Sequence, residues 1–176
     1  MEVKIRKSIA GDACEIEEVR KITWINVYPN KKAGITVADI ESKLKNNANV
    51  KEKQKSEERE KNHGNKTKQT WVAEENGKII GFCAVGNTDR RNRILAIYVR
   101  PQYQNKGIGS KLITNGLKWL GGDKKIYVNV VEYNLNAINF YEKHGFVKTG
   151  KRGVLDSGAK FTNGKSMMEI ELSKLN

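Results

Sequence analysis

Apolar residues follow two kinds of spacing along this chain of 176 residues. Strand-like runs, in which apolar residues alternate or follow one another, occupy residues 3–6, 71–74, 78–85, 94–99, 126–131, 146–149 and 167–172. Helical spacing, with apolar residues three or four apart, occupies residues 12–28, 36–44, 109–120 and 134–144. Hairpin strands thus come first, and a strand–helix–strand–helix–strand series follows. This order predicts a mixed α/β fold with parallel pairing across the central helix.

Turn and capping residues mark several of the expected boundaries. Asn76 and Gly77 separate two apolar runs and predict a tight hairpin, because both residues tolerate a positive φ. Asp12 is placed to cap the first helix, and Gly145 is placed to end the last one. The run 94–99 is apolar on both faces, which predicts a strand at the centre of the sheet.

Residues 45–68 break the pattern of apolar spacing. They hold eight Lys or Arg, four Asp or Glu and almost no apolar side chain. Such a composition does not bury enough apolar surface to offset the entropy of ordering. We expect an exposed charged segment inside a single domain over residues 1–176, either as a solvated helix extension or as a loop.

Composition narrows the environment in which the protein works. No apolar run reaches the ~18 residues of a membrane helix, so we expect no membrane contact. Cys14 and Cys83 lie far apart without metal-type spacing, which fits reduced thiols in a cytoplasmic protein. His63 and His144 are too scattered to predict a metal site.

The formal net charge of +13 favours anionic partners, such as a phosphorylated cofactor, RNA or an acidic surface. The basic excess is spread along the chain rather than confined to residues 45–68. The sequence holds no basic stripe interleaved with aromatic residues, so we expect any RNA binding to be non-specific and sensitive to salt.

A candidate phosphate-binding loop follows the run 94–99. It consists of Gln104, Asn105, Lys106, Gly107, Ile108 and Gly109, and it opens a helical pattern. The start of a helix offers N–H groups without intrahelical partners and the positive end of the dipole, which together attract phosphate. The two glycines let the backbone approach an anion closely, and Lys106 adds a cation. The segment therefore predicts a pyrophosphate site on a strand–loop–helix unit.

Two motifs resemble those of the GNAT superfamily of acyl-CoA N-acyltransferases. Residues 134–146 match the family pattern Asn-x-x-Ala-Ile-x-x-Tyr-Glu-Lys-x-Gly-Phe. Residues 99–109 match the second hallmark, Gln/Arg-x-x-Gly-x-Gly after a strand that ends Val-x-Pro. The resemblance is firm over residues 71–150. It implies a GNAT-like, strongly twisted mixed sheet of six to seven strands with about four helices, whose fourth and fifth strands splay into a V.

The resemblance also implies an activity, the transfer of an acetyl group from acetyl-CoA to a primary amine by direct attack in a ternary complex. The cofactor-binding residues that it implies are Ile97, Tyr98, Val99, Gln104, Asn105, Lys106, Gly107, Ile108, Gly109, Ser110 and Asn134. Tyr141 would be the catalytic acid that protonates the leaving thiolate. Packing on the helix face is the alternative interpretation of Tyr141.

The amine must lose a proton before it attacks, because an alkylamine has a pKa near ~10. Many small members of the family carry a glutamate six positions before the Val of Val-x-Pro, but this chain has Arg93 there. Asp89, Glu132 and Asp39 are other acids that could reach the site, and a water chain is a further route for the proton.

Three residues are candidates for the acceptor side. Trp24 and Tyr28 resemble an aromatic-x3-Tyr pattern of polyamine-type members, although core packing also explains Trp24, and Asn129 lies in the strand 126–131. The acceptor is left open between a small amine or polyamine, a protein amine and an aminoacyl-tRNA. Monomer and homodimer are both left open. The rival hypothesis is a basic RNA- or ribosome-associated module of the same fold, with or without acetylation of an RNA-bound amine.

Overall fold

The computed structural model describes residues 2–45, 67–87, 91–155, 161 and 163–175. These residues form a seven-stranded sheet in the order β1-β2-β3-β4-β5-β7-β6. Its strands are β1 (Lys4–Lys7), β2 (Lys68–Glu75), β3 (Lys78–Asn87), β4 (Asn92–Val99), β5 (Ile126–Val131), β6 (Val147–Val154) and β7 (Met168–Lys174). Neighbouring strands are antiparallel, except that β4 and β5 run parallel. The predicted mixed sheet is confirmed.

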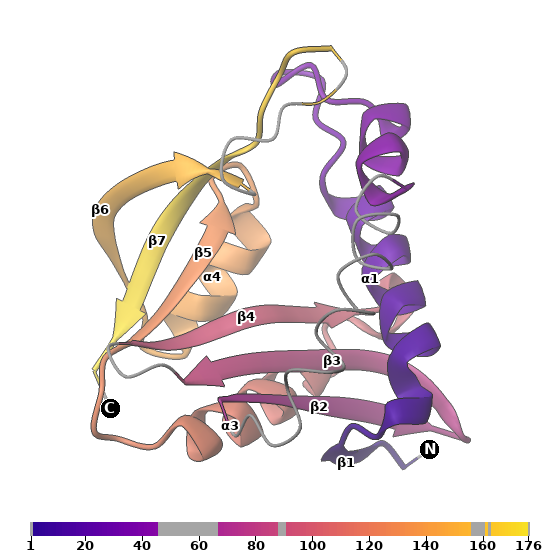
Figure 1. Cartoon of the computed structure of the whole chain (residues 1–176), viewed down its shortest axis with the longest axis vertical. Coiled ribbons are helices and arrows are strands. Elements are labelled where there is room, and N and C mark those ends of the chain that lie inside the picture. Colours follow the sequence, from indigo (N-terminus) through magenta and orange to yellow (C-terminus); the bar gives the residue numbers. More distant parts are fainter. Residues whose placement is uncertain (1, 46–66, 88–90, 156–160, 162, 176) are drawn as a thin grey trace, which may run out of the picture.

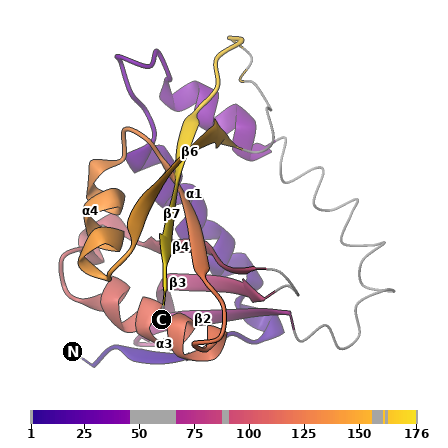
Figure 2. The same ribbon diagram turned by 90° about the vertical axis from the view of Figure 1, so that its left-hand side faces the viewer.

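Helices cover both faces of this sheet (Figures 1 and 2). They are α1 (Ala13–Val27), a helix that includes residues 37–45, α3 (Ile108–Leu120) and α4 (Leu135–Lys143), with the 3-10 turns η1 (Ala10–Asp12) and η2 (Pro101–Tyr103). The helix α1 packs on one face of β3 and β4, and α3 packs on the opposite face. The helix α4 lies on the α3 side, against β5. The four helical patterns of the sequence thus correspond to helices.

The helix α3 lies close to the sheet because a glycine stands on its inner face. Its buried residues are Ile108, Leu112, Ile113, Gly116 and Leu120, as the helical period predicts. A Cβ on Gly116 would lie 2.9 Å from Cγ1 of Val85 and 3.2 Å from Sγ of Cys83. The helix therefore sits at a distance from β3 that any larger side chain would increase.

Most of the predicted turns and caps are confirmed. Asn76 and Gly77 turn the β2–β3 hairpin with φ values of 50° and 75°, and Gly145 follows α4 with a φ of 83°. The cap predicted for Asp12 is wrong. Its carboxylate accepts the N–H of Ile9 at 2.8 Å and two guanidinium N–H groups of Arg6 at 2.7 and 2.9 Å, and it does not bond to the first turn of α1.

The strands β4 and β5 diverge soon after they begin. They pair only at Asn92 with Ile126 and at Arg93 with Tyr127, and then separate into a V that is visible in Figure 1. The register between β3 and β4 shifts here, because Val85 faces Ile94 and Ala84 faces Ala96, so that Leu95 is an extra residue in β4. Such a bulge bends and twists a strand. We call the V-shaped opening the splay.

The bulge also corrects one sequence expectation. The run 94–99 is central in the sheet, as predicted, but it is not buried on both faces. Leu95 is 48% exposed, and Ile97 and Tyr98 are only half-buried. The apolar run therefore does not correspond to a strand that is buried on both faces.

A second apolar cluster lies on the α1 side of the splay. Its buried members are Trp24, Tyr28, Ile35, Ile40, Leu44, Val131, Phe161 and Met167. These residues come from α1, the helix at residues 37–45, the connection between these two helices, the end of β5 and the connection from β6 to β7. Polar contacts join two of these segments, because Nδ2 of Asn163 donates to Oδ2 of Asp39 at 3.0 Å and Nζ of Lys165 donates to the carbonyl of Gly34 at 3.1 Å. The two segments meet above the splay in Figure 1.

The charged segment predicted over residues 45–68 lies outside the described residues except at its two ends. No helix among the described residues combines the length and the apolar character that a membrane span requires.

Candidate active site

Within the described residues, β4 forms no ladder with β5 from Ile94 onward. In a strand, alternate backbone N–H and C=O groups point to each side, so part of those in residues 94–99 face the opening. Ile97, Tyr98 and Val99, which the sequence nominated, form the end of this edge. The carbonyl of Val99 already accepts a hydrogen bond from Nε2 of Gln104 at 3.0 Å, which ties the following loop to the strand. An open edge of this kind can pair with amide groups of an extended ligand.

The loop after β4 leads directly into α3. Asn105 and Gly107 have positive φ values of 60° and 75°, and α3 begins at Ile108. The N–H groups of its first turn have no partner within the helix, as at any helix start. A Cβ on Gly107 would meet no atom within 4 Å, so the space next to this residue is open. Nζ of Lys106 lies 5.3 Å from the ring centroid of Tyr103, at the exposed edge of the loop.

Gly109 packs against α4, which the sequence did not predict. A Cβ at this position would lie 3.2 Å from Cε2 of Phe140 in α4. The missing side chain therefore lets α3 and α4 meet, which gives this glycine a packing role. Gly107 is the glycine of the pair whose conformation and free space suit a bound anion.

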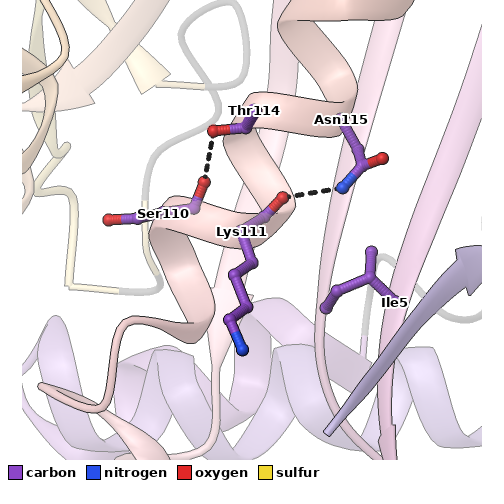
Figure 3. A pocket seen from close by; sticks show the side chains of 5 residues that line it. All are labelled: Ile5, Ser110, Lys111, Thr114 and Asn115. Atoms are coloured by element: carbon purple, nitrogen blue, oxygen red, sulfur yellow. Dashed lines mark hydrogen bonds between the residues drawn. The ribbon is translucent and has the colours of Figure 1, made fainter.

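A surface pocket of about 400 Å³ lies beside the first turns of α3 (Figure 3). It is lined by Ile5, Ser110, Lys111, Thr114 and Asn115. The side chains of Thr114 and Asn115 bond back to the carbonyls of Ser110 and Lys111, at 2.8 and 2.9 Å. Ile5 belongs to β1, at the far edge of the sheet from the splay, so this pocket is separate from the β4–β5 junction. Ser110 lines it as well as belonging to the start of α3.

Tyr141 lies on α4 with its ring in the core. The residue is 4% exposed, and its ring makes edge contacts with Phe140 and Phe146 at centroid distances of 5.4 and 5.5 Å. Its hydroxyl forms no hydrogen bond with another described residue. Burial raises the pKa of Tyr141 well above its usual value, and the nearby Cys83 and Tyr98 add to the shift. The hydroxyl is therefore protonated at neutral pH and is available as a donor.

Asn134 has a structural role that explains its place in the motif. It precedes α4, and its Oδ1 accepts the N–H of Ala137 at 3.1 Å, which caps the helix. Its own N–H donates to the carbonyl of Val131 at 2.9 Å. Asn134 thus fixes α4, and with it Tyr141, to the end of β5.

Tyrosine hydroxyls connect three elements on the α1 side of the splay. The hydroxyls of Tyr28 and Tyr98 lie 3.3 Å apart, and the hydroxyl of Tyr133 donates to the backbone carbonyl of Tyr28 at 2.8 Å. Tyr28 is 7% exposed, and burial is the main cause that raises its pKa well above the usual value. The sequence analysis missed Tyr133. The one signal for it was its position immediately before the Asn134 motif.

The other two acceptor candidates differ in their surroundings. Trp24 is buried and makes an edge contact with Tyr28 at 5.1 Å, in agreement with core packing. Its Nε1 has no hydrogen-bond partner among the described residues. Asn129 is exposed on β5, where its Nδ2 donates to Oε1 of Glu169 on β7.

The carboxylates nominated as bases are held by other groups. Oδ2 of Asp39 accepts from the N–H and the hydroxyl of Thr36, at 2.8 and 2.7 Å, and these bonds hold the pKa of Asp39 below its usual value. Glu132 forms an ion pair with Arg152. Arg93 is half-buried in the short β4–β5 ladder, and Asp89 lies outside the described residues.

Neither cysteine has the surroundings of a nucleophile or a metal ligand. Cys83 is fully buried on β3, and burial raises the pKa of its thiol to about 12, whereas Cys14 is exposed on α1. The described residues contain no group of three or more His, Cys, Asp or Glu that could hold a metal ion.

The arrangement thus brings together an open strand edge, a loop at a helix start and a buried tyrosine hydroxyl. Residues 37–146 match the model of the acetyltransferase (GNAT) family. The chain belongs to the GNAT family. The match includes the loop, β4, β5 and the whole Asn134 motif, and it excludes α1 and the segment from β6 to β7.

Individual GNAT proteins resemble this chain over part of its length. A peptidyl-lysine N-acetyltransferase, YjaB of Salmonella typhimurium, is 35% identical over 92 residues, which is 52% of this chain and 59% of that protein. A spermine/spermidine N(1)-acetyltransferase of Bacillus subtilis is 29% identical over 107 residues, which is 54% of this chain and 65% of that protein. Both matches thus span less than two thirds of the relative.

Solved structures share the fold over the whole chain. The crystal structure of PaiA N-acetyltransferase from Thermoplasma acidophilum, in complex with coenzyme A, covers 100% of both chains with a TM-score of 0.76 and 21% sequence identity. At this identity the likeness concerns the fold. The twisted mixed sheet that the sequence motifs implied is therefore the GNAT fold.

Proposed function

We propose that this protein transfers an acetyl group from acetyl-CoA to a primary amine, by direct attack of the amine on the thioester in a ternary complex. The observation that carries the proposal is the splay between β4 and β5, where the open edge of β4 leads into the loop before α3 and the Tyr141 hydroxyl lies close enough to Tyr98 of β4 to interact with it. Membership of the GNAT family supports the reaction type.

The residues around the splay fit acetyl-CoA as the acyl donor. The start of α3 and the open space beside Gly107 suit the pyrophosphate, and Lys106 adds positive charge. The edge of β4 at Ile97 to Val99, which forms no ladder with β5, suits the amides of the pantetheine arm. The Thermoplasma acidophilum protein of the same fold was crystallised with coenzyme A. We therefore assign the donor site to Ile97, Tyr98, Val99, residues 104–110 and Asn134, the last through its cap on α4.

Acetyl-CoA supplies an activated acyl group, and the chain has to stabilise charge as the thioester is attacked. A backbone N–H on the open edge of β4 can donate to the thioester oxygen. The Tyr141 hydroxyl, protonated because burial raises its pKa, can donate to the sulfur that leaves. An acyl-cysteine intermediate is disfavoured, because the buried Cys83 thiol has its pKa raised to about 12.

The acceptor amine has to arrive without its proton. Asp39 and Glu132 are already engaged by Thr36 and Arg152, and the usual glutamate position holds Arg93. We propose that the neutral fraction of the amine reacts and that its proton leaves through water. This mechanism predicts a steep rise of kcat/KM with pH up to the pKa of the amine.

The acceptor that we propose is a primary alkylamine on a flexible chain, such as a lysine side chain or a polyamine. The two relatives named above act on a peptidyl lysine and on spermine or spermidine, which supports this class. The net positive charge of the chain is weaker support for an RNA-bound acceptor. On the exposed strand β6, Lys148, Lys151 and Arg152 each lie within ion-pair distance of a glutamate, so their charges are partly neutralised.

The test is an acceptor screen with acetyl-CoA that follows release of the free thiol. The panel contains n-butylamine, spermidine, spermine and a lysine peptide, with an amine-free reaction to subtract hydrolysis. In parallel, acetyl-CoA and an unstructured RNA are titrated at low and at physiological salt. We expect amine-dependent thiol release and RNA binding that weakens steeply with salt. Tight, salt-resistant RNA binding without detectable acetyl-CoA binding would favour the RNA module instead.

A further inference from the structure

Tyr133 joins two elements that the splay keeps apart. It lies two residues beyond the end of β5, and its hydroxyl donates to the backbone carbonyl of Tyr28 at 2.8 Å, one residue beyond the end of α1. Because the acceptor is a main-chain carbonyl, this bond holds the end of α1 itself rather than the rotamer of a side chain.

The Tyr28 side chain extends this link to β4. Its hydroxyl lies 3.3 Å from that of Tyr98, which stands on the half-buried end of β4. A chain of hydrogen bonds therefore runs from β5 through α1 to β4. Beyond Arg93 no strand ladder joins β4 to β5, so this chain of three tyrosines is a connection across the splay where the sheet supplies none.

In the proposed function, the acyl donor and the amine use opposite faces of the splay. The loop before α3 and Tyr141 on α4 belong to the face that the acyl donor uses in the proposed function. An amine must then reach the thioester from the other face, where α1 ends and Tyr28, Tyr98 and Tyr133 meet. On that face, the hydrogen bond from Tyr133 to Tyr28 holds the end of α1 against the segment that follows β5.

We propose that Tyr133 is a positioning residue that sets the width of the acceptor side of the splay and thereby selects amines by size. The proposal rests on the acetyl transfer proposed above. Burial raises the pKa of Tyr133 to about 12, so its hydroxyl remains a donor throughout the working pH range. A purely structural Tyr133 would affect stability and leave the preference among amines unchanged, and this difference makes the two roles separable.

The test compares Tyr133→Phe with Tyr127→Phe in the full chain. The first variant removes only the hydroxyl that donates to Tyr28. The second removes a hydroxyl from the same strand region, where the ring lies 4.8 Å from the guanidinium of Arg91 and has no part in the tyrosine chain. The measurements are kcat/KM for n-butylamine and for spermidine, the Kd of acetyl-CoA, and amide exchange over residues 24–28.

In Tyr133→Phe we expect faster exchange of the Tyr28 amide, which donates to the carbonyl of Trp24 at 3.1 Å. We expect the ratio of kcat/KM for spermidine over n-butylamine to change about fivefold, the equivalent of one lost neutral hydrogen bond. The Kd of acetyl-CoA should stay within about twofold, because the substitution alters neither the loop at residues 104–110 nor the backbone of β4. The Tyr127→Phe control should match the wild type in all three measurements.

Two results would overturn the proposal while the proposed function stands. Unchanged exchange would show that the bond does not hold the end of α1, and an unchanged amine ratio in an active variant would show that Tyr133 is only structural. A wild-type protein that acetylates no amine in the panel would overturn the proposed function, and this inference with it.

Discussion

Tyr141→Phe separates catalysis from stability in one substitution. The phenylalanine keeps the ring and its edge contacts with Phe140 and Phe146 at 5.4 and 5.5 Å. It removes only the hydroxyl, which has no hydrogen-bond partner among the described residues. The two effects of the change therefore come from different sources and can be worked out separately.

The effect of Tyr141→Phe on stability should be small. The substitution keeps the buried ring, and it breaks no hydrogen bond with another described residue. We expect the free energy of unfolding to change by less than ~1 kcal/mol. Urea denaturation of both proteins without ligand measures this directly.

The effect on turnover follows from two pKa values. Burial holds the pKa of Tyr141 well above its usual value of ~10, whereas a free thiol has a pKa of ~8.5. Complete proton transfer from the phenol to the leaving thiolate is therefore uphill by at least ~2 kcal/mol. Tyr141 is then more effective as a hydrogen-bond donor to the developing charge, worth ~1.5–3 kcal/mol. We expect kcat to fall about 10- to 150-fold.

The assay measures single-turnover thiol release with saturating acetyl-CoA and the best amine of the acceptor screen, so that chemistry rather than product release is observed. The Kd of acetyl-CoA, measured by calorimetry, should change little. Equal single-turnover rates for wild type and variant would refute the donor role. A large loss of stability would instead show that the hydroxyl has a structural partner.

Three further outcomes are expected. Gly107→Ala forces a side chain into a φ of 75°, so it should cost ~1 kcal/mol of stability and weaken acetyl-CoA binding in calorimetry, although the added Cβ itself meets no atom. Asp12→Asn should cost ~1–2 kcal/mol at pH 7 in urea denaturation. The hydrogen bond from Arg6 lowers the pKa of Asp12, so its contribution is complete above pH ~4, the unfolded value, and the two proteins should converge as the pH falls through the lower folded value. Finally, kcat/KM for the amine should rise about tenfold per pH unit below the pKa of the amine, and a flat profile would point to an enzymic base.

The donor half of the candidate site is readable from the sequence because it is local. The loop at residues 104–109 follows β4 directly and opens α3, so strand, loop and helix start are contiguous. Gly107 shows its conformation through its residue type alone. The role of Gly109 cannot be predicted in this way. A side chain at this position would approach Phe140, and this contact between α3 and α4 is not visible in any local sequence pattern.

The shape of the splay was implied by family resemblance, but its local cause was not predicted. The bulge at Leu95 comes from the register between β3 and β4, and the run 94–99 looks like an ordinary buried strand. The same limit applies to Asp12, a good helix cap by residue type. Its carboxylate bonds instead to Arg6 on the preceding strand and to Ile9.

The acceptor half of the candidate site is harder to predict from the sequence, because it is assembled from distant segments. Tyr28 and Tyr133, whose bond crosses the splay, are 105 residues apart in the chain. Neither α1 nor the segment from β6 to β7 falls within residues 37–146, where the family model matches. On the proposed acceptor side, α1 with Tyr28 thus lies outside the matched residues, whereas Tyr98 and Tyr133 lie inside them. Similarity to relatives therefore supports only the class of the amine. If Tyr133 positions α1 as proposed, the preference between a lysine and a polyamine depends on a contact between distant segments that only the folded chain brings together.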